Sequence, residues 1–482
     1  MDVVLFTDVC SPGFGRYAGT YRIATELRNA GFSVQVVEYF TRWTTDELKK
    51  IISRFVGKDT LLVGISTTFL LNEISRSRAA TAEIRQKYRD SKDEGHRLAE
   101  FLGRTDWPEL YETIKYYNHK TQVSVGGHKV GQFSLGPYLD YAIVGEGEAS
   151  MVALLQGLDD GSRLSGNYLS KKYDGFTTST IRFEDNDLIF PQEQLPVEIA
   201  RGCIFKCKFC SFHLNGKKLW EFNRKPELVT DELQYANDKY GSTGFMFCDD
   251  TYNDSVEKVR TFHTQFKKLS FDQTFSAYAR ADLIISHPET IDMLYESGLR
   301  SVNFGIETLN HDSGKAIGKG MHPEKLKEGL YKIKERWPDV LITAGLIVGL
   351  PHDTPETLRK NNEWFEQKDC PVQYPSYYPL HINTKKGDTD DKSTIENNPF
   401  SFGYQTTDDG YWKSEWMDKI QAEELVNEFD RPGNVVSWVF FNRMQNIGYT
   451  PSDLIHNRVT EEDIIQKENN LMNTYKERLW QI

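Results

Sequence analysis

Strand-like and helix-like segments alternate along most of this chain, and this alternation narrows its fold more than any other feature. In the middle of the chain, apolar segments of strand length are separated by amphipathic helical segments, several of which begin with proline, a residue suited to the first turn of a helix. Strands joined by helices form parallel sheets. Six such units predict an open parallel barrel with functional groups at the carboxyl ends of its strands. The expected strands are 196–200, 244–248, 274–279, 301–306, 342–348 and 372–378, and the expected helices are 226–239, 255–269, 288–297, 323–336 and 355–367.

A second alternation of the same kind occupies the first 160 residues or so. It predicts a doubly wound parallel sheet, with strands at 3–9, 33–39, 60–65, 122–125 and 141–144. The polar stretch 75–104 is interpreted as a surface insertion. The predicted fold class is thus α/β, with an N-terminal doubly wound sheet, a partial (β/α)6 barrel and a mainly helical C-terminal extension. The expected domains are 1–160, a linker at 161–195, the barrel at 196–379, and a helical domain or lid at 380–482.

Charge and apolar content restrict the classes of function. The chain has 482 residues and a formal net charge of −12, which disfavours broad binding to the phosphate backbone of nucleic acids. No apolar run approaches the roughly 18 residues that a membrane span needs. Because the N-terminus also lacks the features of a signal peptide, we expect a soluble, cytoplasmic protein that does not bind a membrane.

The cysteines are unevenly distributed. The chain has six, and Cys203, Cys207 and Cys210 fall within eight residues directly after the first expected barrel strand. A tight cysteine cluster in a reducing compartment indicates a metal site rather than a disulfide framework. Three thiolates can hold an iron–sulfur cube and leave one iron open for another ligand. A zinc site would need a fourth ligand, for which His213 is the nearest candidate.

The Cys-x3-Cys-x2-Cys loop and the barrel around it resemble the radical S-adenosylmethionine (SAM) superfamily over 196–378. The resemblance implies a [4Fe–4S] cluster on Cys203, Cys207 and Cys210, with SAM bound at the open iron. It also implies reductive cleavage of SAM to a 5′-deoxyadenosyl radical, which abstracts hydrogen from a small-molecule substrate. A low-potential electron donor such as flavodoxin or ferredoxin is the implied partner.

The same resemblance implies which residues at the strand ends bind SAM. They are Phe209, Asp249, Arg280, Glu307, Gly345, Ile347 and Gly349. Asp249 is the implied acceptor for the SAM amino group, Arg280 the partner of its carboxylate and Glu307 the acceptor for its ribose hydroxyls. The glycines of the fifth strand would let the adenine approach the backbone. Structural roles are the alternatives. Asp250 or Asn253 could cap the next helix, Arg280 could pair with Asp282, and Glu307 could serve as a capping or salt-bridge residue.

The N-terminal domain resembles the cobalamin-binding domain that precedes the barrel in one branch of this superfamily. Ser66, Gly126 and Gly127 match positions that contact the nucleotide tail of cobalamin in that fold. The histidine of its Asp-x-His-x-x-Gly motif is absent, and Cys10 stands in its place. Two interpretations stay open. The domain binds cobalamin without a protein histidine, or it is an inherited scaffold that has lost or changed its ligand. A dinucleotide site is disfavoured because the third glycine of Gly13-x-Gly15-x-x-x-Gly19 comes one position late.

The reaction outcome is left open by these motifs. With cobalamin, the branch implies methyl transfer. Without it, the radical could drive rearrangement, cyclisation or oxidation. Cys248, Tyr252 and Tyr278 are candidates to deliver a hydrogen atom or to line the pocket. Aromatic clusters at 374–378, 411–416 and 438–441 could form a lid over the barrel, with 383–398 as an entrance loop. The alternative to an enzyme is a non-catalytic protein that binds an iron–sulfur cluster or zinc.

Overall fold

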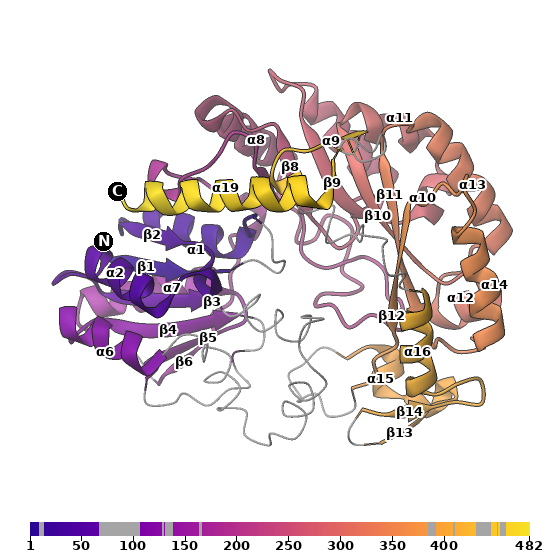
Figure 1. Cartoon of the computed structure of the whole chain (residues 1–482), viewed down its shortest axis with the longest axis horizontal. Helices are drawn as coiled ribbons and strands as arrows, with labels where there is room; N and C mark the ends of the chain where they lie inside the picture. Colours follow the sequence, from indigo (N-terminus) through magenta and orange to yellow (C-terminus); the bar gives the residue numbers. More distant parts are fainter. Residues whose placement is uncertain are drawn as a thin grey trace. The chain divides into compact units, whose positions relative to one another are not determined.

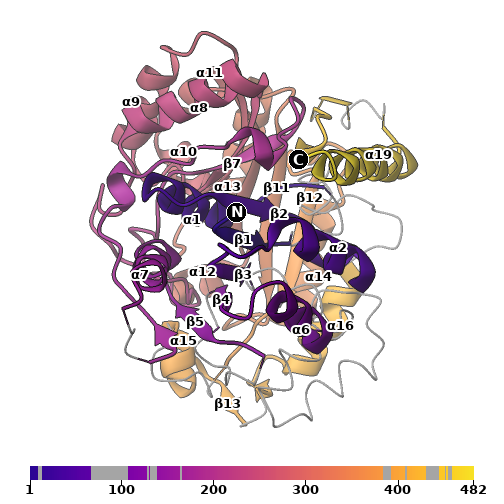
Figure 2. The same ribbon diagram turned by 90° about the vertical axis from the view of Figure 1, so that its left-hand side faces the viewer.

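The computed structural model (Figures 1 and 2) describes residues 1–8, 14–66, 107–127, 130, 138–162, 166–383, 392–407, 410–429, 445–450, 452–453 and 459–482. The chain divides into two compact units. Unit 1 comprises Met1–Phe190 with Lys467–Ile482, and unit 2 comprises Pro191–Gln466. Among the described helices, none is long and apolar enough to cross a membrane.

Unit 1 contains a six-stranded parallel sheet in the order β2-β1-β3-β4-β5-β6. Figure 2 shows α1 and α7 on one side of this sheet and α2 and α6 on the other, which is the doubly wound arrangement expected from the sequence. All residues of β1 and β2 are buried, as is usual for parallel strands covered on both faces. The strands are β1 (Val3–Phe6), β2 (Val34–Val37), β3 (Leu62–Ser66), β4 (Gln122–Gly127), β5 (Tyr141–Val144) and β6 (Tyr168–Leu169), and the helices are α1 (Ala18–Asn29), α2 (Thr45–Phe55), α6 (Trp107–Tyr117) and α7 (Gly147–Asp159).

Most of the segment expected to be a linker is part of unit 1. β6 pairs in parallel with β5 and so becomes the edge strand of the sheet. Further along, the short 3-10 helix η5 (Asp185–Asp187) is tied to α1 by ion pairs. The guanidinium of Arg28 binds both carboxylate oxygens of Asp187 at 2.8 and 2.9 Å. These bonds are buried, and they fix residues up to Phe190 against the first sheet.

The last helix, α19 (Glu461–Leu479), also packs in unit 1 from Lys467 onward. The phenolic oxygen of Tyr475 accepts a hydrogen bond from the backbone N–H of Glu38 at 2.9 Å. Lys476 pairs with Glu47 at 3.1 Å and lies over the ring of Trp43. The end of the chain therefore belongs to the N-terminal sheet and not to a lid that follows the barrel.

Unit 2 contains the second six-stranded parallel sheet, in the order β12-β11-β10-β9-β8-β7. The six expected strands and the helices between them are present, and three helices begin with proline in the first turn, as predicted. The strands are β7 (Gln194–Glu198), β8 (Gly244–Cys248), β9 (Thr274–Ala279), β10 (Leu299–Glu307), β11 (Leu341–Val348) and β12 (Tyr374–Pro379). The helices are α8 (Pro226–Tyr240), α9 (Val256–Phe266), α10 (Ala281–Ser286), α11 (Glu289–Glu296), α12 (His311–Ile317), α13 (Pro323–Arg336) and α14 (Pro355–Phe365).

The two faces of this second sheet differ in polarity. Side chains of one alternating set, such as Phe247, Phe275 and Phe304, are buried in an apolar layer under the helices. The other set forms a row of more polar residues whose backbones are in register from strand to strand. This row contains Glu198, Cys248, Tyr278, Asn303, Thr343 and Tyr374. Because all strands are parallel, their carboxyl ends lie at one edge of the sheet, next to this polar face.

The region after β12 packs beside the barrel strands. It contains α15 (Thr394–Asn397), the short antiparallel pair β13 (Gln405–Thr406) and β14 (Trp412–Lys413), and α16 (Lys419–Phe429). Trp412 was expected in an aromatic lid, but it is fully buried, and its indole N–H donates to the carbonyl of Leu380 at 2.8 Å. It belongs to an apolar core with Val348 and Leu425. The aromatic cluster at 438–441 and most of the entrance loop, 384–391, lie outside the described residues.

Candidate active site

The three clustered cysteines lie in a loop that directly follows β7. An antiparallel bridge between Ala200 and Asn223 closes the base of the loop. Within it, the carbonyl of Cys203 accepts a hydrogen bond from the N–H of Gly216 at 2.7 Å. Gly202 has a φ of +72°, and a Cβ atom on it would lie 2.5 Å from the Cβ of Leu214. The loop is therefore folded tightly back on itself, and it depends on glycine at this turn.

The cysteine sulfurs each have a polar neighbour. Sγ of Cys203 lies 3.2 Å from the hydroxyl of Thr251, Sγ of Cys207 lies 3.6 Å from the guanidinium of Arg280, and Sγ of Cys210 lies 3.1 Å from the side-chain amide of Asn215. All three cysteines are half-buried. Burial is the main cause that raises the pKa of the Cys203 and Cys210 thiols.

No group of three His, Cys, Asp or Glu side chains in the described residues is close enough to hold a single metal ion. His213, the fourth ligand of the zinc alternative, is exposed. Thiolates that bind different irons of a cube need not converge on one point, whereas the ligands of one zinc ion must.

Arg280 lies at the carboxyl end of β9, as the sequence predicted. Its guanidinium forms two bonds to the carboxylate of Asp282, at 3.0 and 2.5 Å, and lies over the ring of Phe205. The structural alternative for Arg280 is thus present. The same guanidinium still directs one nitrogen at Cys207, so Arg280 links β9 to the cysteine loop.

Asp249 was the expected acceptor for the SAM amino group, but its carboxylate is already bonded. One oxygen accepts from the ammonium of Lys258 at 2.7 Å, and the other accepts from the N–H of Thr251 at 3.0 Å. The Lys258 side chain is fully buried, and it also pairs with Asp254 at 3.1 Å. Asp249 therefore holds the β8–α9 turn together.

Asp250 is the more accessible carboxylate of the pair. Its side chain is exposed, and the Gly202 N–H is among its hydrogen-bond donors. The surrounding protein and the neighbouring Asp249 raise the pKa of Asp250 to about 6. The alternative of helix capping by Asp250 or Asn253 is wrong, because Ser255 caps α9 through the N–H of Lys258.

Glu307 ends β10 in a strained conformation. Its φ is +67°, a left-handed value that costs a non-glycine residue about 1–2 kcal/mol, and the register with β11 shifts between Gly305 and Glu307. The carboxylate lies 3.6 Å from the ammonium of Lys319, and both side chains are largely buried. Burial raises the pKa of Glu307. Backbone strain beside a buried carboxylate is typical of a functional position.

The glycines of β11 differ in their surroundings. A Cβ atom on Gly345 would meet nothing closer than Asn303 Oδ1 at 3.9 Å, so this position leaves space for a ligand. Gly349 does not, because a Cβ there would lie 2.5 Å from the Trp412 ring. The φ of +99° and the close indole ring explain why this position requires glycine. The expectation that adenine approaches Gly349 is therefore wrong. Ile347 is partly buried against the same core as Trp412.

The remaining candidates in unit 2 separate into core and surface. Phe209 packs against the apolar core around Trp412. Tyr252 is 1% exposed and lies among Phe247, Phe262 and Phe275, so its expected role in the pocket is wrong. Cys248 and Tyr278 lie on the polar face of the sheet, and Tyr278 is 37% exposed. These two side chains remain candidates to face a substrate.

In unit 1, Ser66, Gly126 and Gly127 lie at the carboxyl ends of neighbouring strands β3 and β4. Among the described residues, a Cβ atom on Gly126 would meet only Ile143, at an ordinary 3.5 Å, so packing against the described part of the chain does not require this glycine. Gly127 has a φ of +150°, which favours glycine. Cys10, the insertion 75–104 and His128 lie outside the described residues.

Several residues of the site were missed by the sequence reasoning. Four residues that were not named as candidates contact the cysteines or the expected SAM ligands: Thr251, Asn215, Lys258 and Lys319. Asp353, in the turn after β11, was not named as a candidate either. Its buried carboxylate accepts from the hydroxyl of Ser313 at 2.7 Å and from the N–H of Leu350 at 3.1 Å. It thereby ties the loop after β11 to α12.

Burial raises the pKa of Asp353 to about 7, well above its unfolded value. The native state then binds a proton that the unfolded chain has released, so this contribution to stability is lost as the pH rises from about 4 to 7 and above. We expect the wild type to lose stability relative to Asp353→Asn as the pH rises from 6 to 8, by at most about 1.4 kcal/mol per pH unit. Chemical denaturation at several pH values measures this difference. A difference between the two proteins that does not change with pH would contradict the prediction.

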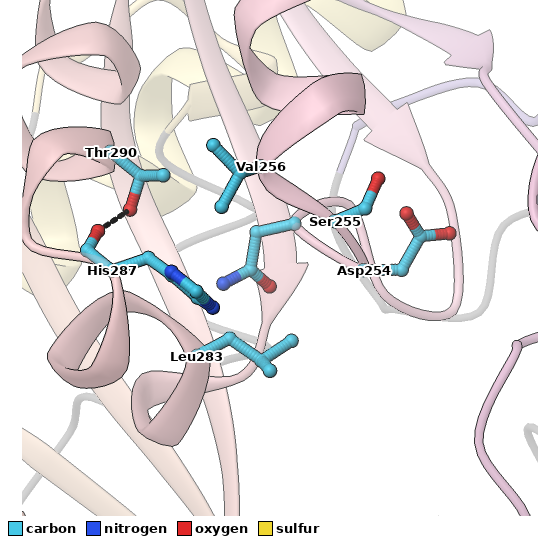
Figure 3. A pocket seen from close by; sticks show the side chains of 7 residues that line it. Asp254, Ser255, Val256, Leu283, His287 and Thr290 are labelled. Atoms are coloured by element: carbon cyan, nitrogen blue, oxygen red, sulfur yellow. Dashed lines mark hydrogen bonds between the residues drawn. The ribbon is translucent and has the colours of Figure 1, made fainter.

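The described residues also enclose a small pocket between the start of α9 and helices α10 and α11 (Figure 3). It is lined by Asn253, Asp254, Ser255, Val256, Leu283, His287 and Thr290. No cysteine or SAM candidate lines it. The hydroxyl of Ser255 is already used to cap α9, and the hydroxyl of Thr290 donates to the carbonyl of His287 at 2.7 Å. This pocket is therefore separate from the candidate active site.

The geometry defines a class of protein. A six-stranded parallel sheet with three clustered cysteines in the loop after its first strand and a strained carboxylate at the end of its fourth strand is the arrangement expected of a cluster-binding radical SAM domain. Residues 197–365 match the family model described as the radical SAM superfamily. The chain therefore carries a radical SAM domain, and the expected resemblance is confirmed. Enzymes with this domain use a [4Fe–4S] cluster and SAM.

Curated relatives support the same domain. An uncharacterised methyltransferase from Pyrococcus horikoshii is 26% identical over 252 residues, which are 48% of this chain and 54% of that protein. An anaerobic magnesium-protoporphyrin IX monomethyl ester cyclase from Rubrivivax gelatinosus is 24% identical over 250 residues, 46% of this chain and 44% of that protein. The chain thus spans about half the length of these relatives.

Two solved structures share the fold over nearly the whole chain. The radical SAM methyltransferase TsrM from Kitasatospora setae, solved with cobalamin and a [4Fe–4S] cluster, has a TM-score of 0.63 at 15% identity, covering 98% of this chain and 99% of its own. The cobalamin-dependent radical enzyme OxsB, solved with aqua-cobalamin and SAM, has a TM-score of 0.55 at 14% identity, covering 99% of this chain and 72% of its own. At these identities the likeness shows the fold, which confirms the expected α/β class.

Proposed function

We propose that this protein is a radical SAM enzyme that binds cobalamin in unit 1 and transfers a methyl group to a small-molecule substrate. The observation that carries the proposal is the arrangement at the carboxyl ends of the second sheet. Cys207, in the cysteine loop after β7, lies 3.6 Å from Arg280 at the end of β9, and Gly345 on β11 leaves open space. The structural likeness to TsrM and the methyltransferase among the curated relatives support methyl transfer, and the likeness to OxsB supports cobalamin binding.

The cluster, when bound, supplies the electron that activates SAM, and cobalamin supplies a carrier for the methyl group. The chain's own residues bind and orient. The three thiolates of the cysteine loop hold the cluster. The exposed carboxylate of Asp250 replaces Asp249 as the acceptor for the SAM amino group, because Asp249 is bonded to Lys258. Glu307 accepts hydrogen bonds from the ribose, and Gly345 leaves space for the adenine.

The glycines of β4 fit the nucleotide tail of cobalamin. The described residues give no packing reason for a glycine at position 126, and the backbone of Gly127 has a φ of +150°, which favours glycine. The sequence places a cysteine where the base-off motif has histidine, so cobalamin would bind here without a protein imidazole. A flavodoxin or ferredoxin in the cytoplasm is the proposed electron donor, and the polar face of the second sheet, with Cys248 and Tyr278, is the proposed substrate surface.

Cobalamin content tests this proposal. After growth with hydroxocobalamin and anaerobic purification, we expect close to one cobalamin per chain in the visible spectrum, beside the broad iron–sulfur absorption. Gly126→Ala should keep the fold and the cluster, because the new Cβ meets only Ile143 at 3.5 Å. It should lose cobalamin at least about tenfold, since the methyl group occupies the space of the tail and overpacking a contact costs 1–3 kcal/mol.

Wild-type protein that binds a cluster but no cobalamin would contradict the methyl-transfer version. The same radical domain would then carry out a cobalamin-independent rearrangement, cyclisation or oxidation. Equal cobalamin in the wild type and in Gly126→Ala would place the tail elsewhere than at β4.

A further inference from the structure

Each of the three clustered cysteines has a side-chain N–H or O–H group within hydrogen-bond distance of its sulfur, and the three groups come from different places in unit 2. Thr251 follows β8, Arg280 ends β9, and Asn215 belongs to the cysteine loop itself. We propose that Thr251, Asn215 and Arg280 act together as a donor set that raises the reduction potential of the cluster. The inference deepens the proposed function, since it requires that the three cysteines bind a [4Fe–4S] cluster.

The side chain of Asn215 is positioned to donate a hydrogen bond to Sγ of Cys210. Its amide nitrogen lies 3.1 Å from Sγ of Cys210 and 3.4 Å from the carbonyl of the same residue. Its amide oxygen is buried and has no hydrogen-bond partner among the described residues. Leu214 and Gly216 on either side both have a left-handed backbone, with φ of +60° and +79°. A thiolate can only accept, so the amide presents its N–H₂ group to the sulfur despite the cost to its oxygen.

Thr251 is a donor that can turn towards its sulfur. Its hydroxyl lies 3.2 Å from Sγ of Cys203 and 2.7 Å from the carbonyl of Asp250, and it has one proton for the two acceptors. The anionic sulfur of a bound cluster is the stronger acceptor. The Thr251 side chain cannot move away, because the residue is 5% exposed and its N–H is bonded to Asp249.

Arg280 adds a full positive charge to the set. The carboxylate of Asp282 and the ring of Phe205 fix its guanidinium plane and leave one nitrogen 3.6 Å from Sγ of Cys207. Arginine stays protonated at any working pH. Its position relative to the sulfur is thus constant, and it does not depend on a titration.

Reduction adds one electron to the cluster and makes its sulfurs more negative. Donors that point at the sulfurs stabilise the reduced form more than the oxidised form, and hydrogen bonds to sulfur are among the factors that set cluster potentials. Removing one donor should therefore make reduction harder without removing any ligand of the cluster.

The test is the midpoint potential of the reconstituted cluster, followed by EPR during a mediated titration without SAM. For Thr251→Val and Asn215→Leu we expect the ratio of reduced to oxidised cluster at a fixed potential to fall about tenfold each, which is 59 mV for one electron. Thr251→Ser keeps the hydroxyl and should keep the wild-type potential. Thr261→Val is the matched control, because it removes a hydroxyl on α9 that bonds only the carbonyl of Glu257.

Iron and sulfide content, measured on the same samples, separates the outcomes. Wild-type potentials in both Thr251→Val and Asn215→Leu, with full clusters, would overturn the donor set and leave the proposed function intact. Loss of iron without a shift in the clusters that remain would show a purely structural role and would also overturn it. Wild-type protein that forms no [4Fe–4S] signal at all would instead contradict the proposed function.

Discussion

Replacing Cys207 by alanine should remove the [4Fe–4S] cluster and reduce SAM turnover to background. Cys207 is the middle one of the three proposed cluster ligands, and its sulfur is the one that Arg280 approaches. With two thiolates left, the cluster loses its attachment on one iron, and the open iron that should bind SAM is no longer defined. Iron and sulfide content, visible absorption and EPR of the anaerobically reconstituted variant measure the loss.

Cys370→Ala is the matched control for that variant. Cys370 is also half-buried, but it lies in the loop before β12, and burial raises the pKa of its thiol to about 11. β12 and β7 are the two opposite edge strands of the second sheet, and Cys370 precedes its strand whereas the cysteine loop follows β7. Cys370 is therefore at the amino ends of the parallel strands, away from the cysteine loop. The control should keep its cluster and its activity. Full activity in Cys207→Ala, or an equal loss in Cys370→Ala, would contradict the assignment of the loop.

The second large effect is expected at Glu307. Glu307→Gln should weaken SAM binding about 10- to 100-fold, because a hydrogen bond to a charged group contributes about 1.5–3 kcal/mol. Cluster content should not change, since Glu307 does not contact a cysteine within hydrogen-bond distance in the described structure. The measurement is the SAM concentration that half-saturates the change in the EPR signal of the reduced cluster.

Glu307→Gly separates function from stability at the same position. Glycine adopts a φ of +67° without the strain that glutamate carries. The relief of about 1–2 kcal/mol offsets the loss of the ion pair with Lys319 and the added freedom of the unfolded chain, so the free energy of unfolding should change by no more than about 1 kcal/mol in either direction. SAM binding should be lost even so. A loss of stability well beyond about 1 kcal/mol would indicate that Glu307 serves the fold instead.

The alternation of strands and helices was sufficient to predict both sheets except for the edge strand β6, which lies in the segment expected to be a linker. Buried strands such as β1 and β11 are continuous apolar runs, and prolines and glycines mark the ends of the helices between them. The position of α19 could not be predicted in this way. Tyr475 meets Glu38 across 437 residues of sequence, and no local pattern carries information about such a contact.

Residue type and spacing were enough to propose the three cysteines, Arg280 and Glu307 as site residues. Prediction from the sequence failed where a partner distant in the sequence decides the role of a residue. Asp249 and Asp250 are equivalent in the sequence, and only the buried Lys258 distinguishes them. Gly349 was predicted to bind SAM, but the ring of Trp412 occupies the space beside it. Tyr252 read as a pocket residue, although its ring lies in the phenylalanine core.

The central claim is that this chain activates SAM at a cluster held by its three clustered cysteines. The most direct measurement is the analysis of SAM and its products by liquid chromatography and mass spectrometry after anaerobic incubation of the reconstituted protein with SAM and dithionite. We predict that SAM is consumed, with 5′-deoxyadenosine or S-adenosylhomocysteine as a product, in the wild type and in Cys370→Ala but not in Cys207→Ala. Intact SAM in the presence of a full, reduced and EPR-active cluster would contradict the claim.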